Sequence, residues 1–387
     1  MPSLYLHIPF CERKCAYCDF MSVESRARIP QFLESLEREI VLSAPLGEGV
    51  LFDTVFFGGG TPSLLPPEAI VRILEQLGSA YAIDSCAEIT LEANPGTTTA
   101  PRLRGYRDAG VNRLSIGVQS FRDEELRFLG RIHGSDEARR AVGEARAAGF
   151  ANVSIDLIYG LPGQTAADWR STLEGAIALA PDHISAYNLI VEEGTPLGRK
   201  VRAGSVTPNS PDVDAGLASL TGSVLADAGF EQYEISNHAR PGFRSRHNLA
   251  YWTHEPYLGF GPSSHSFWRD RGAPLGRRWW NTADLRDYGD RLASGGRPVA
   301  GEECLTRHEA VVERVFLGLR SVGVDLSRME AEFGWSPDPG EESILAAVLR
   351  ASHATLHRGV LRLTRSGYLL CDEIAARLLP PTIPVSP

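Results

Sequence analysis

Six short apolar runs alternate with amphipathic stretches, and this alternation constrains the fold more than any other feature of the sequence. Between the runs, apolar residues recur with a helical period, as they do over 29–41, 69–77 and 138–145. Strands that alternate with helices favour a parallel sheet with right-handed crossovers, either open and doubly wound or closed into a complete or partial barrel. The predicted strands are 4–8, 54–57, 88–91, 113–118, 153–159 and 183–190.

Polar and glycine-rich residues lie at or near the carboxyl ends of these predicted strands. In a β/α barrel the active site is built at that end of the strands. We therefore expect an α/β fold whose first part, residues 1–235, is a partial (β/α)6 barrel. The residues in question are Cys11–Cys18, Gly58–Pro62, Glu92, Gln119, Asp156 and 192–194.

The remainder of the chain divides into two predicted regions. Residues 236–302 are rich in Gly, Pro, Arg and aromatic residues and are expected to be irregular. From 303 to 380 a helical pattern returns and is followed by a hairpin signal at 360–368, which predicts a small helical, winged-helix-like domain. Such domains often bind DNA, but 305–387 carry 9 Arg, no Lys and 10 acidic residues, so a docking or lid role is favoured.

The net charge and the first ten residues predict where the protein is found and argue against a nucleic-acid partner. The formal net charge of −9 disfavours binding to nucleic acid. The first ten residues lack the basic and apolar regions of a secretory signal, and no run of 18 apolar residues predicts a membrane span. We expect a cytoplasmic protein with no nucleic-acid partner.

Three of the six cysteines are clustered, which predicts a metal centre. Cys11, Cys15 and Cys18 share a short loop after the first predicted strand, so three thiolates can face one centre. A structural zinc site normally needs a fourth ligand, for which His7 is the nearby candidate. An iron–sulfur cluster bound through cysteine thiolates fits the set better. The scattered Cys86, Cys304 and Cys371 are interpreted as small core residues.

Together with Tyr17 before the third cysteine and the turn Gly58–Pro62, the pattern C-x3-C-x2-C resembles the radical S-adenosylmethionine (SAM) superfamily. The resemblance implies a [4Fe-4S] cluster held by Cys11, Cys15 and Cys18, with SAM on the fourth iron and an electron donor as partner. The glycine turn also makes physical sense alone, because backbone without Cβ can approach a ligand closely.

Further positions match the coproporphyrinogen-oxidase-like (HemN/HemW) branch of that superfamily. Taken singly, each matching residue has a structural alternative, such as a strand-end cap, a salt-bridge partner or a surface charge. Their order and placement together imply a SAM site. The residues implied for SAM are Tyr5, Tyr17, Gly59, Gly60, Thr61, Glu92, Gln119, Arg131, Asp156 and Ile158.

The branch contains an oxygen-independent coproporphyrinogen III oxidase and a HemW-type haem chaperone, and three features favour the chaperone. The chain begins ten residues before Cys11, which leaves no room for the oxidase's longer N-terminal arm. Phe20 stands where the oxidase has an extra cysteine. The segment His247-Asn248-Leu-Ala-Tyr251-Trp252 resembles the chaperone's H-N-x-x-Y-W haem signature.

The same segment can be interpreted from its chemistry. A neutral imidazole such as that of His247 is a good axial ligand for haem iron, and Tyr251 and Trp252 offer flat apolar faces to a porphyrin. Asn248 completes the motif, and His265 is a second candidate ligand. The alternative is an ordinary loop histidine beside core aromatics.

We therefore expect a haem chaperone that carries a cluster and SAM and delivers haem to an unknown acceptor protein. A respiratory, membrane-bound acceptor, and attachment to the membrane periphery through it, are family-level expectations. The alternatives are the oxidase itself, which would make the chain an enzyme of oxidative decarboxylation, and a radical SAM enzyme acting on RNA, which the acidic charge disfavours.

Overall fold

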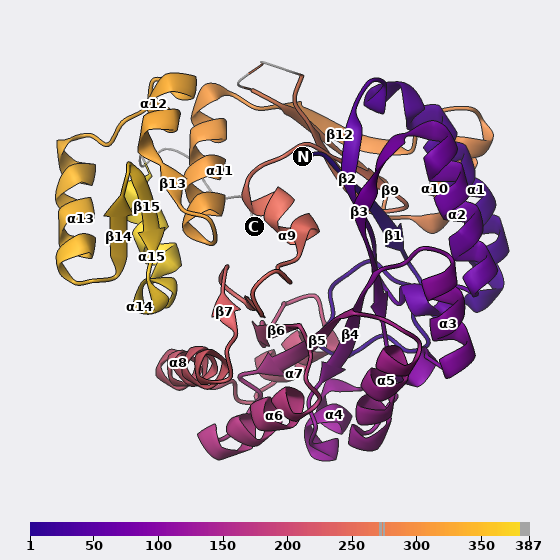
Figure 1. The fold of residues 1–387 in the computed structure, drawn as a ribbon, viewed down its shortest axis with the longest axis horizontal. Coiled ribbons are helices and arrows are strands. Elements are labelled where there is room, and N and C mark those ends of the chain that lie inside the picture. The colour runs from indigo at the N-terminus through magenta and orange to yellow at the C-terminus, as the bar shows by residue number, and fades with distance from the viewer. Residues whose placement is uncertain (271–272, 274, 380–387) are drawn as a thin grey trace.

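A computed structural model describes residues 1–270, 273 and 275–379. A single curved sheet of twelve strands forms its frame, in the order β12-β11-β10-β9-β1-β2-β3-β4-β5-β6-β8-β7 (Figure 1). The strands are β1 (Ser3–Ile8), β2 (Leu51–Gly59), β3 (Ala82–Ala93), β4 (Arg113–Gln119), β5 (Asn152–Tyr159), β6 (His183–Asn188), β7 (Glu231–Gln232), β8 (Asn237–Ala239), β9 (Tyr257–Phe260), β10 (His265–Trp268), β11 (Arg277–Asn281) and β12 (Val299–Cys304).

Parallel pairing runs from β9 through β1 to β6, and the strands beyond β9 and β6 pair antiparallel. Helices α1 to α6 cover the outer face of the curve, whereas α9 lies on its inner side (Figure 1). The helices of this part are α1 (Ile29–Ser43), α2 (Pro67–Ala80), α3 (Ala100–Asp108), α4 (Asp123–Leu129), α5 (Ser135–Ala147), α6 (Ala166–Ala178), α7 (Pro196–Arg202), α8 (Pro211–Asp227), α9 (Arg246–Trp252) and α10 (Leu285–Ala293).

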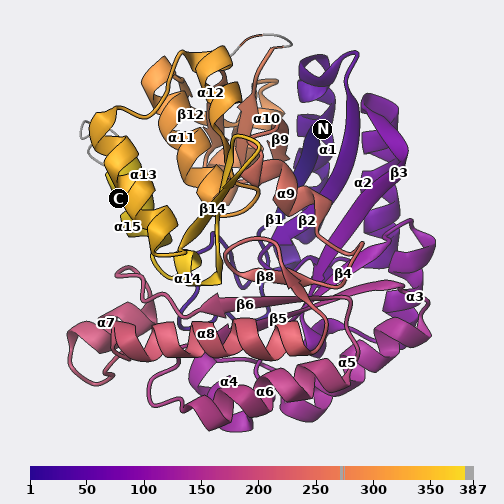
Figure 2. The same ribbon diagram turned by 60° about the vertical axis from the view of Figure 1, so that its left-hand side comes forward.

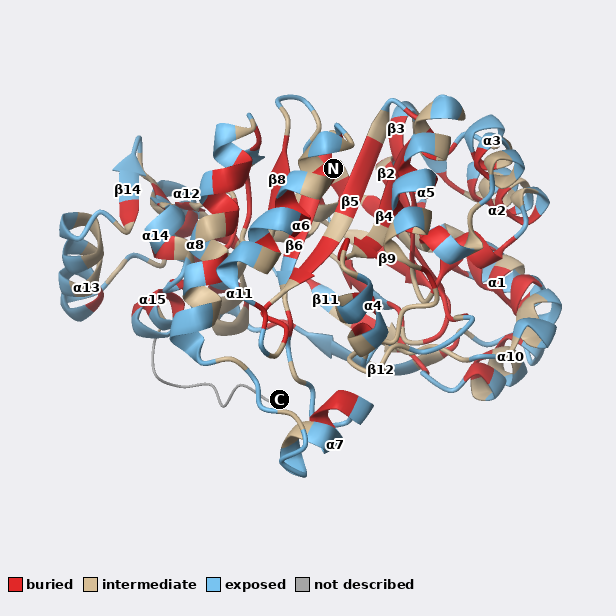
Figure 3. Cartoon of the chain, turned by 90° about the horizontal axis from the view of Figure 1, so that it is seen from below, coloured by how far each residue is buried: buried red, intermediate tan, exposed pale blue. Residues whose placement is uncertain are grey.

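The main core lies between the sheet and its outer helices. Leu4, Leu6 and Ile8 of β1 are fully buried and belong to the cluster that continues into α1 through Leu36 and Ile40. Successive side chains of a strand point to opposite faces of the sheet. The residues of β1 that alternate with Leu4, Leu6 and Ile8 therefore point to the inner side of the curve. Figure 3 shows the strands largely buried and the outward faces of the helices exposed.

The predicted α/β class is confirmed, and all six predicted strands are present as β1 to β6. The region 236–302 is more regular than expected, because it contains β8 to β12, α9 and α10. These strands are at most six residues long and are separated by Gly- and Pro-containing turns, which hid their periodicity. Through β9, the region completes the parallel part of the sheet beside β1.

The C-terminal part has a core of its own and lies on the inner side of the curved sheet (Figure 2). Its hairpin joins β14 to β15, whereas the sequence placed the second half of the hairpin at 364–368, which is instead the helix α14. Position 380, the last residue of the predicted domain, lies outside the described residues. The elements are α11 (Arg307–Leu319), β13 (Val324–Asp325), α12 (Leu326–Phe333), α13 (Pro339–Arg350), β14 (Ala354–His357), β15 (Val360–Leu363), α14 (Arg365–Tyr368) and α15 (Cys371–Leu378).

Four short 3-10 helices among the described residues lie in the connections between strands and helices: η1 (Arg26–Arg28), η2 (Ala44–Gly47), η3 (Pro62–Leu64) and η4 (Pro95–Thr97). Among the described residues, no helix has both the length and the apolar character needed to cross a bilayer.

Candidate cofactor site

The three clustered cysteines lie on the loop that follows β1, and all three are free thiols of intermediate exposure. The pKa of Cys18 is raised to about 11, mainly by burial and in smaller part by the nearby sulfurs of Cys15 and Cys11. Thr61 Oγ1 donates to Cys11 Sγ over 3.7 Å, and Arg131 Nη1 donates to Cys15 Sγ over 3.5 Å. These donors stabilise negative charge on sulfur, which suits thiolate ligands.

His7 is not free to serve as a fourth ligand. Its Nε2 lies 2.8 Å from the carbonyl oxygen of Met21, and its Nδ1 lies 3.2 Å from the Tyr5 hydroxyl. In the described part of the chain, no three His, Cys, Asp or Glu side chains are grouped to hold a single metal ion. With His7 engaged, the nearby donors are three cysteine thiolates, a set that fits a multi-iron cluster better than a four-ligand zinc site.

The glycine turn after β2 lies directly against the start of the cysteine loop. Gly60 N–H donates to the carbonyl of Ile8 over 2.9 Å, and Thr61 N–H donates to that of Phe10 over 2.7 Å. A Cβ on Gly60 would lie 2.7 Å and 2.8 Å from those two carbonyl oxygens. Gly59 adopts a φ of +104°, which glycine tolerates best. Only glycine at these positions lets the two loops meet.

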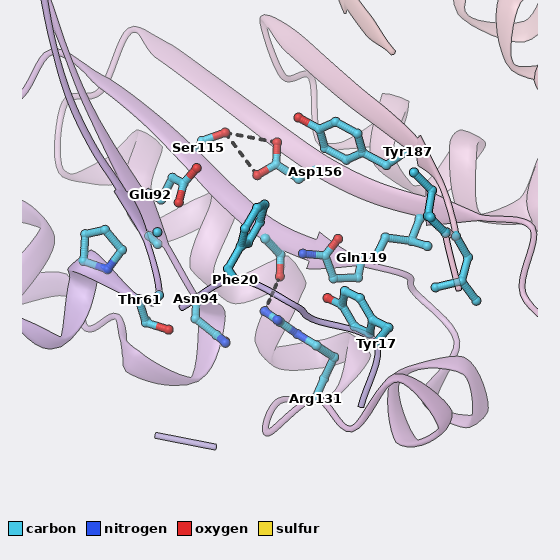
Figure 4. A pocket seen from close by; sticks show the side chains of 18 of the residues that line it. Tyr17, Phe20, Thr61, Glu92, Asn94, Ser115, Gln119, Arg131, Asp156 and Tyr187 are labelled. Carbon is cyan, nitrogen blue, oxygen red and sulfur yellow. Dashed lines mark hydrogen bonds between the residues drawn. The ribbon is translucent and has the colours of Figure 1, made fainter. Parts of the chain in front are cut away.

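Beside this turn lies a pocket of about 330 Å³ at the carboxyl ends of β1 to β6 (Figure 4). It contains nine of the ten residues that the sequence assigned to SAM, so the topology brings them together. Tyr5 does not line it. The nine are Tyr17, Gly59, Gly60, Thr61, Glu92, Gln119, Arg131, Asp156 and Ile158.

Two carboxyl groups lie inside the pocket. The pKa of Glu92 is raised to about 8, mainly by burial and in smaller part by the charge of Asp156, while a hydrogen bond from the Gly59 backbone opposes the shift. Burial also raises the pKa of Asp156, whose oxygens accept from Ser115 Oγ at 3.0 and 3.1 Å. A cationic ligand that donates hydroxyl hydrogens would stabilise both carboxylates.

Gln119 is held in a strained conformation at the end of β4. Its φ is +68°, in the left-handed region that non-glycine residues seldom adopt, and the register with β5 shifts next to it. Its Oε1 is buried and has no hydrogen-bond partner among the described residues. Strain together with an unpaired polar atom is typical of a residue that contacts a ligand.

Sequence reasoning missed several residues of this pocket, among them Ser115, Asn94 and Tyr187. Ser115 lies two and four residues before Gly117 and Gln119 on β4, so the period of a strand places it on the same face and was the available signal. Asn94 and Tyr187 also line the pocket. Phe20, which the sequence marked only as a departure from the oxidase, projects its ring into the pocket among the labelled polar groups (Figure 4).

The His247 motif forms α9, on the inner side of the sheet. His247 is buried, with Nδ1 2.7 Å from Thr54 Oγ1 and Nε2 3.1 Å from the Tyr251 hydroxyl. Its ring stacks on Phe56 at 4.8 Å, and Tyr5 lies 6.3 Å away. Tyr5 is also close enough to Glu92 of the pocket for that carboxylate to add to the rise that burial causes in the pKa of Tyr5. Both ring nitrogens of His247 are engaged, so ligation of haem iron by this residue stays a prediction and needs one of these contacts to open.

The other predicted haem residues do not meet at one point. Asn248 and Trp252 are half-buried on α9, and Asn248 N–H donates to Ser245 Oγ at the start of the helix. His265 is exposed on β10 and stacks on Trp280 at 6.0 Å.

Glu88 of β3 holds the start of α9, and sequence reasoning missed this role. Its carboxylate accepts from the backbone N–H groups of Arg246 and His247 at 3.0 and 3.1 Å.

Comparison with known proteins assigns the fold and site to a family. Residues 5–176 match the model of the radical SAM superfamily. A Bacillus subtilis protein named heme chaperone HemW is 35% identical over 98% of this chain and 99% of its own length. The chain belongs to the HemW family. A second HemW relative, from Mycobacterium tuberculosis, is 37% identical over 97% of this chain and 94% of its own length.

HemW family membership agrees with the solved structures. Coproporphyrinogen III oxidase (HemN) from Escherichia coli, described as a radical SAM enzyme, superposes with a TM-score of 0.84 at 26% identity, covering 97% of this chain and 90% of its own. The resemblance of the sequence to the HemN/HemW branch is therefore confirmed.

Proposed function

We propose that this chain is a haem chaperone that binds haem, carries a [4Fe-4S] cluster and SAM, and passes haem to an acceptor protein. The observation that carries the proposal is the near full-length match to proteins named heme chaperone HemW. The position of Phe20, whose ring stands in the SAM pocket where the oxidase has a cysteine, supports the chaperone over the oxidase.

The residues present fit both resident cofactors. Cys11, Cys15 and Cys18 would hold the cluster, and the glycine turn would let the amino group of SAM lie next to it. A reduced cluster of this kind supplies one electron to the sulfonium of bound SAM. The chain's own contribution is positional: Arg131 holds Cys15, Glu92 offers a carboxylate to ligand hydroxyls, and Gln119 directs an unpaired amide oxygen.

Haem transfer is tested directly with the reconstituted protein. The chain is loaded with haem under anaerobic conditions and mixed with an apo-haemoprotein whose spectrum reports uptake. We expect the acceptor to gain haem faster from the loaded chain than from free haem. If the chain binds no haem, or releases none to any acceptor tested, the proposed function is wrong.

Coproporphyrinogen oxidation is the second candidate, and the likeness to HemN favours it. Anaerobic incubation with reductant, SAM and coproporphyrinogen III, followed by chromatography, separates the two. We expect no decarboxylated porphyrin. Protoporphyrinogen formed at catalytic turnover would make the chain an oxidase. Variants with alanine at each cluster cysteine control for the cofactor, since they should lose the brown cluster absorption.

A further inference from the structure

One arginine is buried in the sheet just beyond the SAM pocket. Arg113 is the first residue of β4 and is only 2% exposed. Side chains of a strand alternate between its two faces, so Arg113 points to the same face as Ser115, which lines the pocket. The two residues are about 6–7 Å apart along the strand. Arg113 therefore lies one layer of side chains behind the pocket, toward the amino end of β4.

The guanidinium of Arg113 is a buried charge. Its Nε is shielded from solvent and has no hydrogen-bond partner in the part of the chain that the structure describes. A guanidinium keeps its proton in proteins. A buried charge also acts over a longer distance than an exposed one, because little water and salt screen it. Arg113 can therefore influence charged groups that it does not touch.

The two carboxyl groups of the pocket lie on the strands that flank β4. In the sheet register, Glu92 of β3 is the partner of Ser115, and Asp156 of β5 is the partner of Gly117. Figure 4 shows both carboxyl groups beside Ser115. Burial is the main cause that raises the pKa of each group, and the positive charge of Arg113 opposes that rise in both. Arg113 thus favours the ionised carboxylates, which accept from ligand hydroxyl groups and attract a cationic ligand.

The other side chains around these carboxylates do not supply the same charge. Arg131, the arginine that lines the pocket, donates to Cys15 Sγ and to the carbonyl oxygen of Gly117. The remaining titratable neighbours are neutral, because burial raises the pKa of the tyrosines and lowers that of the histidines. They are Tyr5 of β1, His183 and Tyr187 of β6, Tyr233 between β7 and β8, and His247 and Tyr251 of α9.

We propose that Arg113 is a positioning residue for SAM, whose buried positive charge supports the negative charges of Glu92 and Asp156 at the SAM site. The inference rests on the proposed function, because SAM is the ligand that these carboxylates are expected to bind. The rival interpretation is purely structural: Arg113 would only balance Glu88. That carboxylate lies on the same face of β3, two residues before Thr90, which is the register partner of Arg113.

The test measures SAM binding to the cluster-loaded full chain by anaerobic calorimetry, over a pH range that spans the Glu92 pKa of about 8. If SAM binds the ionised carboxylate, its affinity rises with pH and levels off above that pKa. Arg113→Met removes the charge and keeps a long apolar side chain. We expect the rise to move up by about one pH unit or more, so that affinity below it falls about tenfold. Titration of SAM itself is the same for every variant.

Two further variants separate charge from shape and from a general effect. Arg113→Lys keeps the charge without the planar guanidinium and should keep the profile of the unaltered chain. It decides the question even if Arg113→Met does not fold, since weakened binding by the lysine variant would make the shape of the guanidinium the cause. Arg140→Met removes a 65% exposed charge from α5 and, as the matched control, should leave the profile unchanged.

The outcomes distinguish this inference from the proposed function. A loss of affinity in Arg113→Met that is equal at every pH would overturn the inference, because that is what a structural role predicts. In a Glu92→Gln background, Arg113→Met should displace the profile by less, and an equal displacement would also contradict the inference. If the unaltered chain binds SAM but the displacement is missing, the inference alone is wrong. If the unaltered chain binds no SAM, the cofactor part of the proposed function is wrong as well.

Discussion

Replacing Glu88 with alanine should destabilise the segment that carries the haem motif. Glu88 is 7% exposed, and it accepts from the backbone N–H groups of Arg246 and His247 and, at 3.4 Å, from Ser245 Oγ. Its carboxylate thus satisfies the first free donors of α9 and complements the positive end of that helix. Each buried N–H left without an acceptor costs about 1–3 kcal/mol, so we expect a loss of about 3–5 kcal/mol.

The free energy of unfolding is measured by urea denaturation, and native-state hydrogen exchange reports the two amides individually. Glu88→Gln keeps one acceptor oxygen and should lie between alanine and the unaltered chain. Glu75→Ala, an exposed glutamate on α2, is the matched control and should change stability by less than about 0.5 kcal/mol. A loss of less than about 1 kcal/mol for Glu88→Ala, with unchanged exchange in α9, would refute the reasoning.

Three further predictions concern the site and its supports. Gly60→Ala should lower cluster content after reconstitution and cost about 1–3 kcal/mol, because its Cβ meets backbone oxygens, whereas Gly78→Ala, with open space around its Cβ, should leave cluster content unchanged. Gln119→Gly should raise the free energy of unfolding by about 1 kcal/mol while weakening SAM binding measured by calorimetry; unchanged affinity would argue against a ligand contact. Burial raises the pKa of Glu39 to about 7, so the folded chain keeps a proton that the unfolded chain releases above its ordinary value of 4.5. This group therefore lowers stability as pH rises between those values, by up to about 3 kcal/mol, and urea denaturation of Glu39→Gln should show a shallower decline; identical slopes would contradict the assignment.

The parallel sheet and the grouping of nine predicted residues around one pocket could be predicted because their signals are local. Each of the six strands contains a short apolar run, and several polar residues of the pocket, such as Glu92 and Gln119, stand at or near a strand end, where parallel topology brings distant positions together. Gly59 and Gly60 were identifiable for the same reason. Tyr5 was placed in the site by resemblance alone, and in the structure it does not line the pocket and lies 6.3 Å from the ring of His247.

Long-range polar contacts could not be predicted in this way. Glu39 lies within the apolar stripe of α1, next to Ile40, yet its partners Gly261, Asn281 and Tyr288 are more than 200 residues away. A charged residue in such a stripe is a signal of burial, but it does not identify the partner. Glu88 is similar, because its role depends on a helix some 160 residues later.

The position of β1 in the middle of the sheet has a consequence for biosynthesis. One edge of β1 pairs with β2, but the other pairs with β9, which lies about 250 residues further along the chain. At about 5–20 residues per second, a ribosome needs on the order of 12–50 s to deliver β9. During that interval the strand that leads into the cysteine loop has an open edge. Insertion of iron and sulfur before β9 is made would therefore act on an unfinished sheet, and the mature site can close only when translation has passed residue 260.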